Sequence, residues 1–335
     1  MSNIAAIELS TLKLQRVVLE VFGGCNYTCK MCPQGTEEGR EPSFLRKMPL
    51  RLFEEILDQI TPKYGKPVIN LEGSGEPTLA RDLPKYIQAC TDRGLKSFIY
   101  CNGANFHGQY MRDCIDAGLT LIRFSVIGYN REEYKHWMEV DNWDLITRNV
   151  IEAIAYVKET GADCSIDSYH LIQDPNNADY ELAEYRKNFI DVVGTNAYVW
   201  KMHNWAGNLE AGYQRLGFGI TEKRSCGRPF APELTIRAGG LKGHRGAVTP
   251  CCQTMGPPAE SLSVLGHMDT QTFEEVWMGD LYENLRDAHM KGEFDRVPFC
   301  ENCDFLIADP EVLVWSNVES VKLGRPLGTE LNMNQ

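Results

Sequence analysis

The sequence predicts an α/β protein built on a parallel sheet, followed by a small cysteine-rich C-terminal region. Between about residues 17 and 203, short apolar runs rich in β-branched residues alternate six times with longer amphipathic runs. Such alternation is typical of parallel strands joined by right-handed helical crossovers. The pattern leaves open whether the sheet is doubly wound or curled into a barrel. In both cases ligands bind at the carboxyl ends of the strands.

The predicted elements follow the chain in strict alternation. The strands are Val17–Phe22, Val68–Glu72, Ser97–Cys101, Leu121–Val126, Cys164–Ile172 and Ala197–His203. The helices between them are Leu50–Ile60, Leu83–Arg93, Gly108–Ala117, Trp143–Thr160 and Tyr180–Val192. Glycines at 94, 118 and 161 follow three of these helices, where a left-handed residue commonly ends a helix.

Unusual residues gather where the predicted strands end. In chain order they are Gly23-Gly24-Cys25, Gly73-Ser74-Gly75-Glu76-Pro77, Cys101-Asn102-Gly103, Ser125, Asp167 to His170, and Lys201 to Trp205. Because the carboxyl ends of parallel strands meet at one edge of a sheet, we expect these residues to form one functional site.

Composition excludes several classes of protein. The chain has 335 residues, of which 43% are hydrophobic and 24% charged, as in ordinary globular proteins. Its net charge of −12 disfavours a sequence-independent nucleic-acid binder, which needs cations to neutralise phosphates. No stretch reaches the ~18 apolar residues of a membrane span, and no secretory signal is predicted at the N-terminus. We therefore expect a cytoplasmic protein that binds neither nucleic acid nor membrane.

After about residue 210 the character of the sequence changes. A Gly-rich stretch separates two apolar runs that are predicted to form a hairpin, Leu234–Arg237 and Ala247–Thr249. Two amphipathic helices, Thr272–Trp277 and Leu281–Lys291, follow before a Cys-x2-Cys pair. We expect two domains, residues 1–209 and 210–335.

The twelve cysteines fall into three groups. The first is Cys25, Cys29 and Cys32; the second is Cys226, Cys251, Cys252, Cys300 and Cys303; and Cys90, Cys101, Cys114 and Cys164 stand singly. Because cytosolic thiols stay reduced, clustered cysteines there indicate metal binding or catalysis rather than disulfides. The single cysteines are interpreted as small buried hydrophobic residues.

The first cysteine group has the spacing Cys-x3-Cys-x2-Cys. Three thiolates on one short loop can hold three corners of a cubic iron–sulfur cluster, which normally takes four cysteines. One iron would then lack a protein ligand, and an open metal position is typical of catalysis. A zinc site completed by a distant His or Cys is the alternative that spacing alone leaves open.

This cysteine loop at the end of the first strand, with Gly75-Glu76-Pro77 after the second, resembles the radical S-adenosylmethionine (SAM) superfamily. The resemblance runs from about residue 17 to 205 and implies a partial (β/α)6 barrel. It implies that Cys25, Cys29 and Cys32 bind a [4Fe–4S] cluster whose fourth iron takes the amino and carboxylate groups of SAM.

The same resemblance implies further contacts with SAM. Met31 occupies the place of a residue that packs near adenine, and Ser74-Gly75-Glu76 corresponds to the segment that meets the SAM amino group. Ser125 resembles a fourth-strand serine that contacts SAM, and Asn102 is a further candidate at the third strand end.

One position departs from the family pattern. Many relatives have an arginine thirteen residues after that serine, paired with the SAM carboxylate, and this chain has Met138 there. Lys135 and His136 are the nearest alternative cations.

The C-terminal cysteines resemble the Twitch or shortened SPASM extension of the same superfamily. That resemblance implies one auxiliary [4Fe–4S] cluster on four ligands: Cys226, Cys251, Cys300 and Cys303. Cys252 competes with Cys251, and the spacing from Gly246 favours Cys251. A structural zinc ribbon on the same thiolates is the alternative.

The resemblance implies an enzyme that receives an electron from a flavodoxin- or ferredoxin-type donor and cleaves SAM reductively. The 5′-deoxyadenosyl radical then abstracts a substrate hydrogen, and an auxiliary cluster that takes an electron favours two-electron oxidation. Oxidation of a hydroxyl also needs a proton acceptor. The candidates are Asp167, Tyr169, His170, Lys201 and His203.

Three functions remain open at this stage. The first is dehydrogenation of a small polyol, aminocyclitol or sugar-like substrate. The second is modification of a peptide or protein by crosslinking, epimerisation or sulfatase-type maturation. The third, from another class, is a zinc-stabilised binding protein without catalysis.

Overall fold

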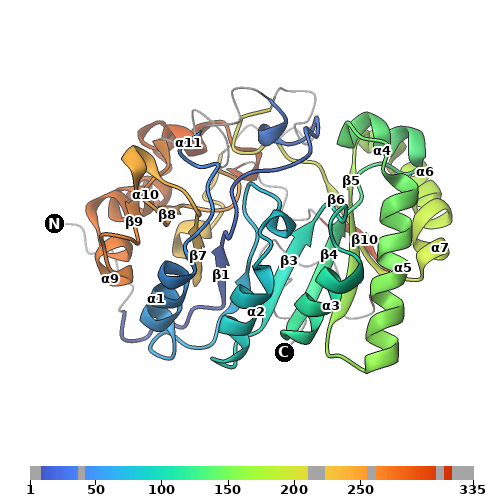
Figure 1. Cartoon of the computed structure of the whole chain (residues 1–335). Helices are drawn as coiled ribbons and strands as arrows, with labels where there is room; N and C mark the ends of the chain where they lie inside the picture. The colour runs from blue at the N-terminus through green and yellow to red at the C-terminus, as the bar shows by residue number, and fades with distance from the viewer. Residues whose placement is uncertain (1–8, 37–41, 210–222, 255–261, 307–312, 319–335) are drawn as a thin grey trace.

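The computed structural model describes residues 9–36, 42–209, 223–254, 262–306 and 313–318. Its described strands form one ten-stranded sheet in the order β10-β6-β5-β4-β3-β2-β1-β7-β8-β9 (Figure 1). The first six strands run parallel to their neighbours in chain order. They are β1 (Arg16–Leu19), β2 (Val68–Asn70), β3 (Ser97–Cys101), β4 (Leu119–Ser125), β5 (Ser165–Ile172) and β6 (Asn196–Lys201). The predicted α/β architecture with a parallel sheet is confirmed.

Helices cover the outer face of these strands (Figure 1). Four lie where the sequence predicts them: α1 (Leu50–Ile60), α2 (Leu83–Thr91), α3 (Gly108–Asp116) and α5 (Trp143–Thr160). In α1, buried residues recur at the helical spacing of one face, as at Phe53, Ile56 and Ile60.

Two helical segments differ from the prediction. The sequence predicts one helix over Tyr180–Val192, whereas the structure has α6 (Ala178–Tyr185), a π-helical turn and then α7 (Asp191–Val193). Helix α4 (Arg131–Met138) is not predicted, because only Tyr134 and Met138 of its eight residues are buried. Its start is instead fixed by the Asn130 side chain, which accepts a hydrogen bond from the backbone N–H of Glu133.

The C-terminal region extends the barrel sheet at both edges. Strand β7 (Glu233–Ile236) runs parallel to β1, and β8 (Ala247–Thr249) runs antiparallel to β7, which confirms the predicted hairpin. Strand β9 (Gly266–His267) follows β8, and β10 (Leu313–Ser316) pairs antiparallel with β6. Helices α9 (Phe273–Trp277), α10 (Asp280–Lys291) and α11 (Pro298–Glu301) belong to this region. Within the described residues, no helix has the length and apolar character needed to cross a membrane.

A buried ion pair joins β4 and β5 inside the sheet. Arg123 Nη2 lies 3.1 Å from Asp167 Oδ2, and both side chains are almost fully buried. Arg123 also donates to the Tyr100 hydroxyl at 2.8 Å, and its guanidinium carbon lies 3.8 Å from the centre of the Tyr198 ring. The low-dielectric surroundings make each charge dependent on the other.

Replacing Asp167→Ala should therefore lower the free energy of unfolding by about 3–5 kcal/mol, because Arg123 would remain charged and buried without its carboxylate. The control is Glu55→Ala, which removes the exposed Arg51–Glu55 pair (2.7 Å) and should cost less than about 1 kcal/mol. Anaerobic chemical unfolding of both variants measures the difference. Equal losses would contradict the assignment of Asp167 to stability.

Candidate active site

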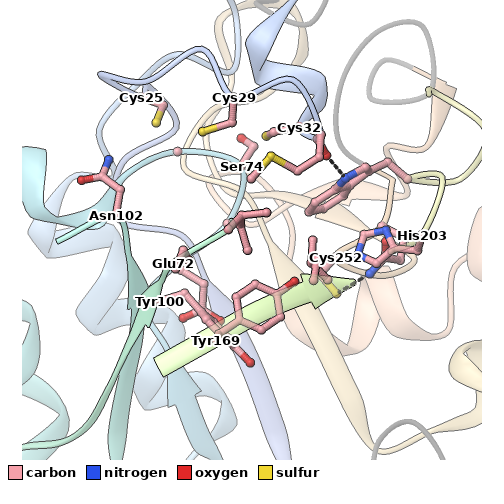
Figure 2. Close-up of a pocket in the computed structure, with 18 of the residues that line it drawn as sticks. Cys25, Cys29, Cys32, Glu72, Ser74, Tyr100, Asn102, Tyr169, His203 and Cys252 are labelled. Atoms are coloured by element: carbon pink, nitrogen blue, oxygen red, sulfur yellow. Dashed lines mark hydrogen bonds between the residues drawn. The ribbon is translucent and has the colours of Figure 1, made fainter. Parts of the chain in front are cut away.

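A cavity of about 280 Å³ opens at the carboxyl ends of the parallel strands and is closed on one side by the C-terminal region. Figure 2 shows the three N-terminal cysteine thiols along one side of this cavity and Glu72, Tyr100 and Tyr169 at the other. Residues from the C-terminal region also line it: Arg228, Cys252, Gln253 and Phe305. The strand ends that the sequence singled out therefore converge on one site.

The thiols of Cys25, Cys29 and Cys32 all face this cavity. Burial raises the pKa of the Cys25 thiol to about 12, and repulsion from Glu76 and Cys32 adds to it. Burial and the two neighbouring cysteines raise the pKa of Cys29 as well. Three thiolates this close are stable only when a metal neutralises their charge. The arrangement fits the three protein ligands of an iron–sulfur cluster.

The loop after β2 packs directly against this cysteine loop. A Cβ atom on Gly75 would lie 2.2 Å from the carbonyl oxygen of Phe22, so only glycine fits at this position. The backbone N–H of Glu76 donates to the Gly24 carbonyl at 2.8 Å. The two loops that the family resemblance assigns to the cluster and to SAM therefore form one unit.

Glu76 joins the ends of β2 and β3. Its carboxylate accepts from the backbone N–H of Asn102 at 2.7 Å and from that of Thr78 at 3.0 Å. Burial raises the pKa of Glu76, while these hydrogen bonds oppose the rise. Asn102 in turn donates to the Asn26 side chain at 2.8 Å, which ties the third strand end to the cysteine loop. Glu76 and Asn102 line the cavity, and their contact with SAM stays a prediction.

A second buried ion pair holds Ser74, the first residue of the Ser74-Gly75-Glu76 segment. Glu20 at the end of β1 lies 3.1 Å from Arg237, which follows β7, and neither side chain is exposed by more than 1%. The Glu20 carboxylate also accepts from the Ser74 backbone N–H at 2.6 Å and from the Ala238 backbone N–H at 3.0 Å. Arg237 donates to the Ser74 hydroxyl. Sequence reasoning missed both ionic residues, although a glutamate within the apolar run Val17–Phe22 was a visible signal.

The other predicted SAM contacts also line the cavity. Met31 and Ser125 do so from the cysteine loop and the end of β4. Met138 lies beside the cysteines, with its sulfur 3.7 Å from the Cys29 sulfur. Lys135 and His136, the alternative cations, are not among the lining residues; His136 Nδ1 lies 3.2 Å from the Lys30 ammonium. The described cations that line the cavity are Arg16, Lys201 and Arg228.

The structure brings some of the predicted proton acceptors into the cavity and not others. Tyr169, Lys201 and His203 line it. Asp167 does not, because it is paired with Arg123 deeper in the sheet. His170 faces away from the cavity and stacks on Tyr185, with ring centres 4.5 Å apart.

The four cysteines expected to hold the auxiliary cluster lie close together. Burial raises the pKa of the Cys251 thiol to about 12, Arg228 opposes the rise, and repulsion from Cys252 and Cys226 adds to it. Burial also raises the pKa values of Cys300 and Cys303, and repulsion from Cys251 and Cys226 adds to the rise.

Cys252, the competing ligand, adjoins Cys251 but is not among the groups whose charge acts on Cys300 and Cys303. It lines the cavity (Figure 2), and Arg228 Nη1 donates to its sulfur at 3.6 Å. This placement agrees with Cys251 as the fourth ligand. In the described part of the chain, no three His, Cys, Asp or Glu side chains converge on a single-ion site. A [4Fe–4S] cluster needs no such convergence, since each cysteine binds a different iron.

Contacts after β6 connect the two cysteine groups. Trp205 Nε1 donates to the carbonyl of Met31 in the first cysteine loop at 2.7 Å. One residue earlier, the Asn204 backbone N–H donates to Asp304, beside Cys303, at 3.0 Å. The segment after β6 therefore holds both cysteine loops against the cavity.

Two sequence families match this chain. Residues 19–185 match the radical SAM superfamily, and residues 243–304 match the iron–sulfur cluster-binding SPASM domain. A curated relative, named "Probable GTP 3′,8-cyclase", from Metallosphaera sedula, is 30% identical over 38% of this chain and 39% of its own length. The chain spans about half or less of the length of the curated relatives that it matches first.

Solved structures share the fold at low sequence identity. BtrN in complex with AdoMet and 2-DOIA aligns with 89% of this chain and 94% of its own, with a TM-score of 0.57 and 16% identity. Streptococcus suis SuiB bound to the precursor peptide SuiA aligns with 88% of this chain and 70% of its own, with a TM-score of 0.53 and 17% identity. These similarities establish the architecture, a barrel-like sheet with a cysteine-rich C-terminal region.

The placement of the two adjacent cysteines generates a prediction. Cys251→Ser should lower bound iron from ~8 to ~4 per chain, because only the auxiliary [4Fe–4S] cluster is lost. Cys252→Ser should leave ~8 iron atoms, since its sulfur faces the cavity. Anaerobic iron and acid-labile sulfide analysis measures both. The opposite pattern would assign Cys252 as the ligand.

The buried Glu20–Arg237 ion pair leads to a second prediction about the site. Arg237→Met should destabilise the protein by about 3–5 kcal/mol, because the Glu20 carboxylate would stay buried without a cation. It should also weaken SAM binding, since Glu20 and Arg237 both hold Ser74. The control is Lys63→Met, which removes the exposed Lys63–Glu274 ion pair. This pair also joins the barrel to the C-terminal region, and its loss should destabilise the protein by about 1 kcal/mol or less. Chemical unfolding measures the stability of both variants, and calorimetry measures their affinity for SAM. Unchanged SAM affinity in Arg237→Met would contradict the positioning role.

Proposed function

Because the chain belongs to the radical SAM superfamily and carries an SPASM domain, we propose that it oxidises a small polyol, aminocyclitol or sugar-like substrate by two electrons. The observation that carries this proposal is the cavity at the strand ends, where polar side chains lie opposite the cysteines. The three cysteines lie on one side, and side chains that can bind hydroxyl groups face them. A substrate held between them would present a C–H bond toward the cysteine side.

Residues of this chain would hold the cofactors as follows. Cys25, Cys29 and Cys32 would ligate the SAM-binding cluster, and the loop at Ser74 to Glu76 would position SAM beside it. When bound, such a cluster supplies the electron for reductive cleavage of SAM, whose 5′-deoxyadenosyl radical abstracts the substrate hydrogen. The auxiliary cluster would be held by Cys226, Cys251, Cys300 and Cys303. With all four irons ligated by the protein, this cluster would be suited to accept an electron.

The protein's own contribution is position and proton transfer. Tyr169, Lys201 and His203 line the cavity and are the proposed partners of the substrate hydroxyl. His203 contacts both Trp205 and Phe305, with ring centres 4.4 and 5.6 Å away, so its imidazole is held in place. An imidazole accepts a proton near neutral pH, which suits His203 to receive the hydroxyl proton.

Peptide modification is the second candidate function. SuiB, whose structure holds a precursor peptide, shares the fold. BtrN, whose structure holds AdoMet and 2-DOIA, shares it over a larger part of its own length. The closure of this cavity by Arg228 and Phe305 from the C-terminal region supports the small-molecule substrate.

Anaerobic incubation with SAM, a reductant and candidate substrates tests the proposal. The expected result is 5′-deoxyadenosine together with a product that has lost two hydrogens. Cys303→Ala should retain SAM cleavage and abolish product formation, because an auxiliary-cluster ligand is removed. An unchanged product mass with solvent deuterium incorporated would indicate epimerisation instead, and unimpaired turnover by Cys303→Ala would overturn the role of the second cluster.

A further inference from the structure

Two acceptor oxygens stand together at the end of the cavity opposite the cysteines. They belong to Asn70, the last residue of β2, and Glu72, two residues further along the chain, and both side chains line the cavity. Among the described residues, neither Asn70 Oδ1 nor Glu72 Oε2 has a hydrogen-bond partner, although both atoms are buried. Buried polar atoms are rarely left unpaired, so this pair of oxygens indicates a missing donor.

The orientation of the Asn70 amide follows from its neighbour. Its Nδ2 donates to Glu72 Oε1 at 2.8 Å, and an ionised carboxylate can only accept. The amide oxygen must therefore face the other way. Asn70 and Glu72 therefore present two acceptor oxygens to the cavity. Such a pair suits a ligand group with several N–H donors.

The surroundings of Glu72 favour a positively charged donor. The charge of Arg16 on β1 acts on Glu72, and Arg16 also pairs with Glu233 at 3.5 Å. The aromatic rings of Tyr100 and Tyr169 adjoin the carboxylate (Figure 2), 5.6 Å apart between their centres. Carboxylates and aromatic ring faces both attract an ammonium group.

We propose that Asn70 and Glu72 form a subsite for a primary ammonium group of the substrate. The substrate is then an amino-bearing cyclitol or sugar rather than a plain polyol, an inference that rests on the proposed function and narrows it. The ammonium group binds at this end of the cavity, and the rest of the ring extends toward the cysteines.

The protonation of Glu72 supports this assignment. Burial raises its pKa to about 7, while the Asn70 amide, the charge of Arg16 and the backbone N–H groups of Glu72 and Tyr100 oppose the rise. The titratable groups that line the same cavity from the neighbouring strands are Arg16 from β1, Tyr100 from β3, Tyr169 from β5 and Lys201 from β6. Because an ammonium binds the ionised carboxylate, affinity for an amine should fall as the pH drops below about 7.

Calorimetry on the cluster-loaded protein with SAM tests the subsite without requiring turnover. The probes are 2-deoxystreptamine, which carries amino groups, and scyllo-inositol, a similar ring with hydroxyls only. Glu72→Gln should weaken 2-deoxystreptamine binding about 10- to 100-fold, the loss of one charge-assisted hydrogen bond. It should also abolish the pH dependence and leave scyllo-inositol binding within about threefold.

Glu233→Gln is the matched control, because it removes the carboxylate that pairs with Arg16 but does not line the cavity. It should keep the pH dependence of amine binding. Unchanged cluster absorbance and SAM affinity in Glu72→Gln verify that this variant is folded. If Glu72→Gln binds the amine as tightly as the unmodified protein, or if the unmodified protein binds no amine at millimolar concentration, the subsite is overturned.

Failure of the subsite and failure of the proposed function give different results. Amine binding that depends on Glu72, without loss of two hydrogens from any bound amine, would retain the subsite and overturn the oxidation. Oxidation of an amine-bearing substrate by Glu72→Gln at an unchanged rate and an unchanged KM would retain the oxidation and overturn the subsite.

Discussion

The buried ion pair between Glu20 and Arg237 is the interaction on which the site depends. Two charges are removed from water, and this is tolerated only when each has partners in good geometry. Glu20 meets this condition by accepting hydrogen bonds from Ser74, Arg237 and Ala238. Its partners come from two separate parts of the chain: the loop after β2 and the segment that follows β7. One carboxylate therefore sets the loop after β2, which we propose positions SAM, against the C-terminal region.

This junction explains why the cavity has two chemically different ends. The loop that Glu20 holds packs on the cysteine loop, with Gly75 leaving no room for a side chain. Before that loop in the chain, Asn70 at the end of β2 and Glu72 two residues later line the end of the cavity opposite the cysteines. The site thus combines a sulfur-rich end suited to redox chemistry with a polar end suited to recognition. The C-terminal region supplies the wall between them through residues such as Arg228 and Cys252.

Much of the site was predictable, because its residues lie at strand ends that periodicity locates. The N-terminal cysteines, Ser74 to Glu76, Ser125 and His203 all line the cavity as a group. His170 shows a limit of that reasoning. Successive strand residues point to opposite faces, so His170 cannot share the cavity with Tyr169, and the alternation could have shown this. Glu72 was overlooked because a single carboxylate at a strand end carries no motif.

The sequence by itself determined the positions of the six strands along the chain, the edge at which ligands are expected to bind and the three cysteines of the N-terminal loop, because these depend on local periodicity and spacing. Only the tertiary structure decided which side Cys251 and Cys252 each face, and that Asp167 is committed to Arg123. It also showed that β7 joins β1 in the same sheet. These features depend on contacts between residues far apart in the chain, and the free energy of burying a charge is set by partners that no local pattern specifies.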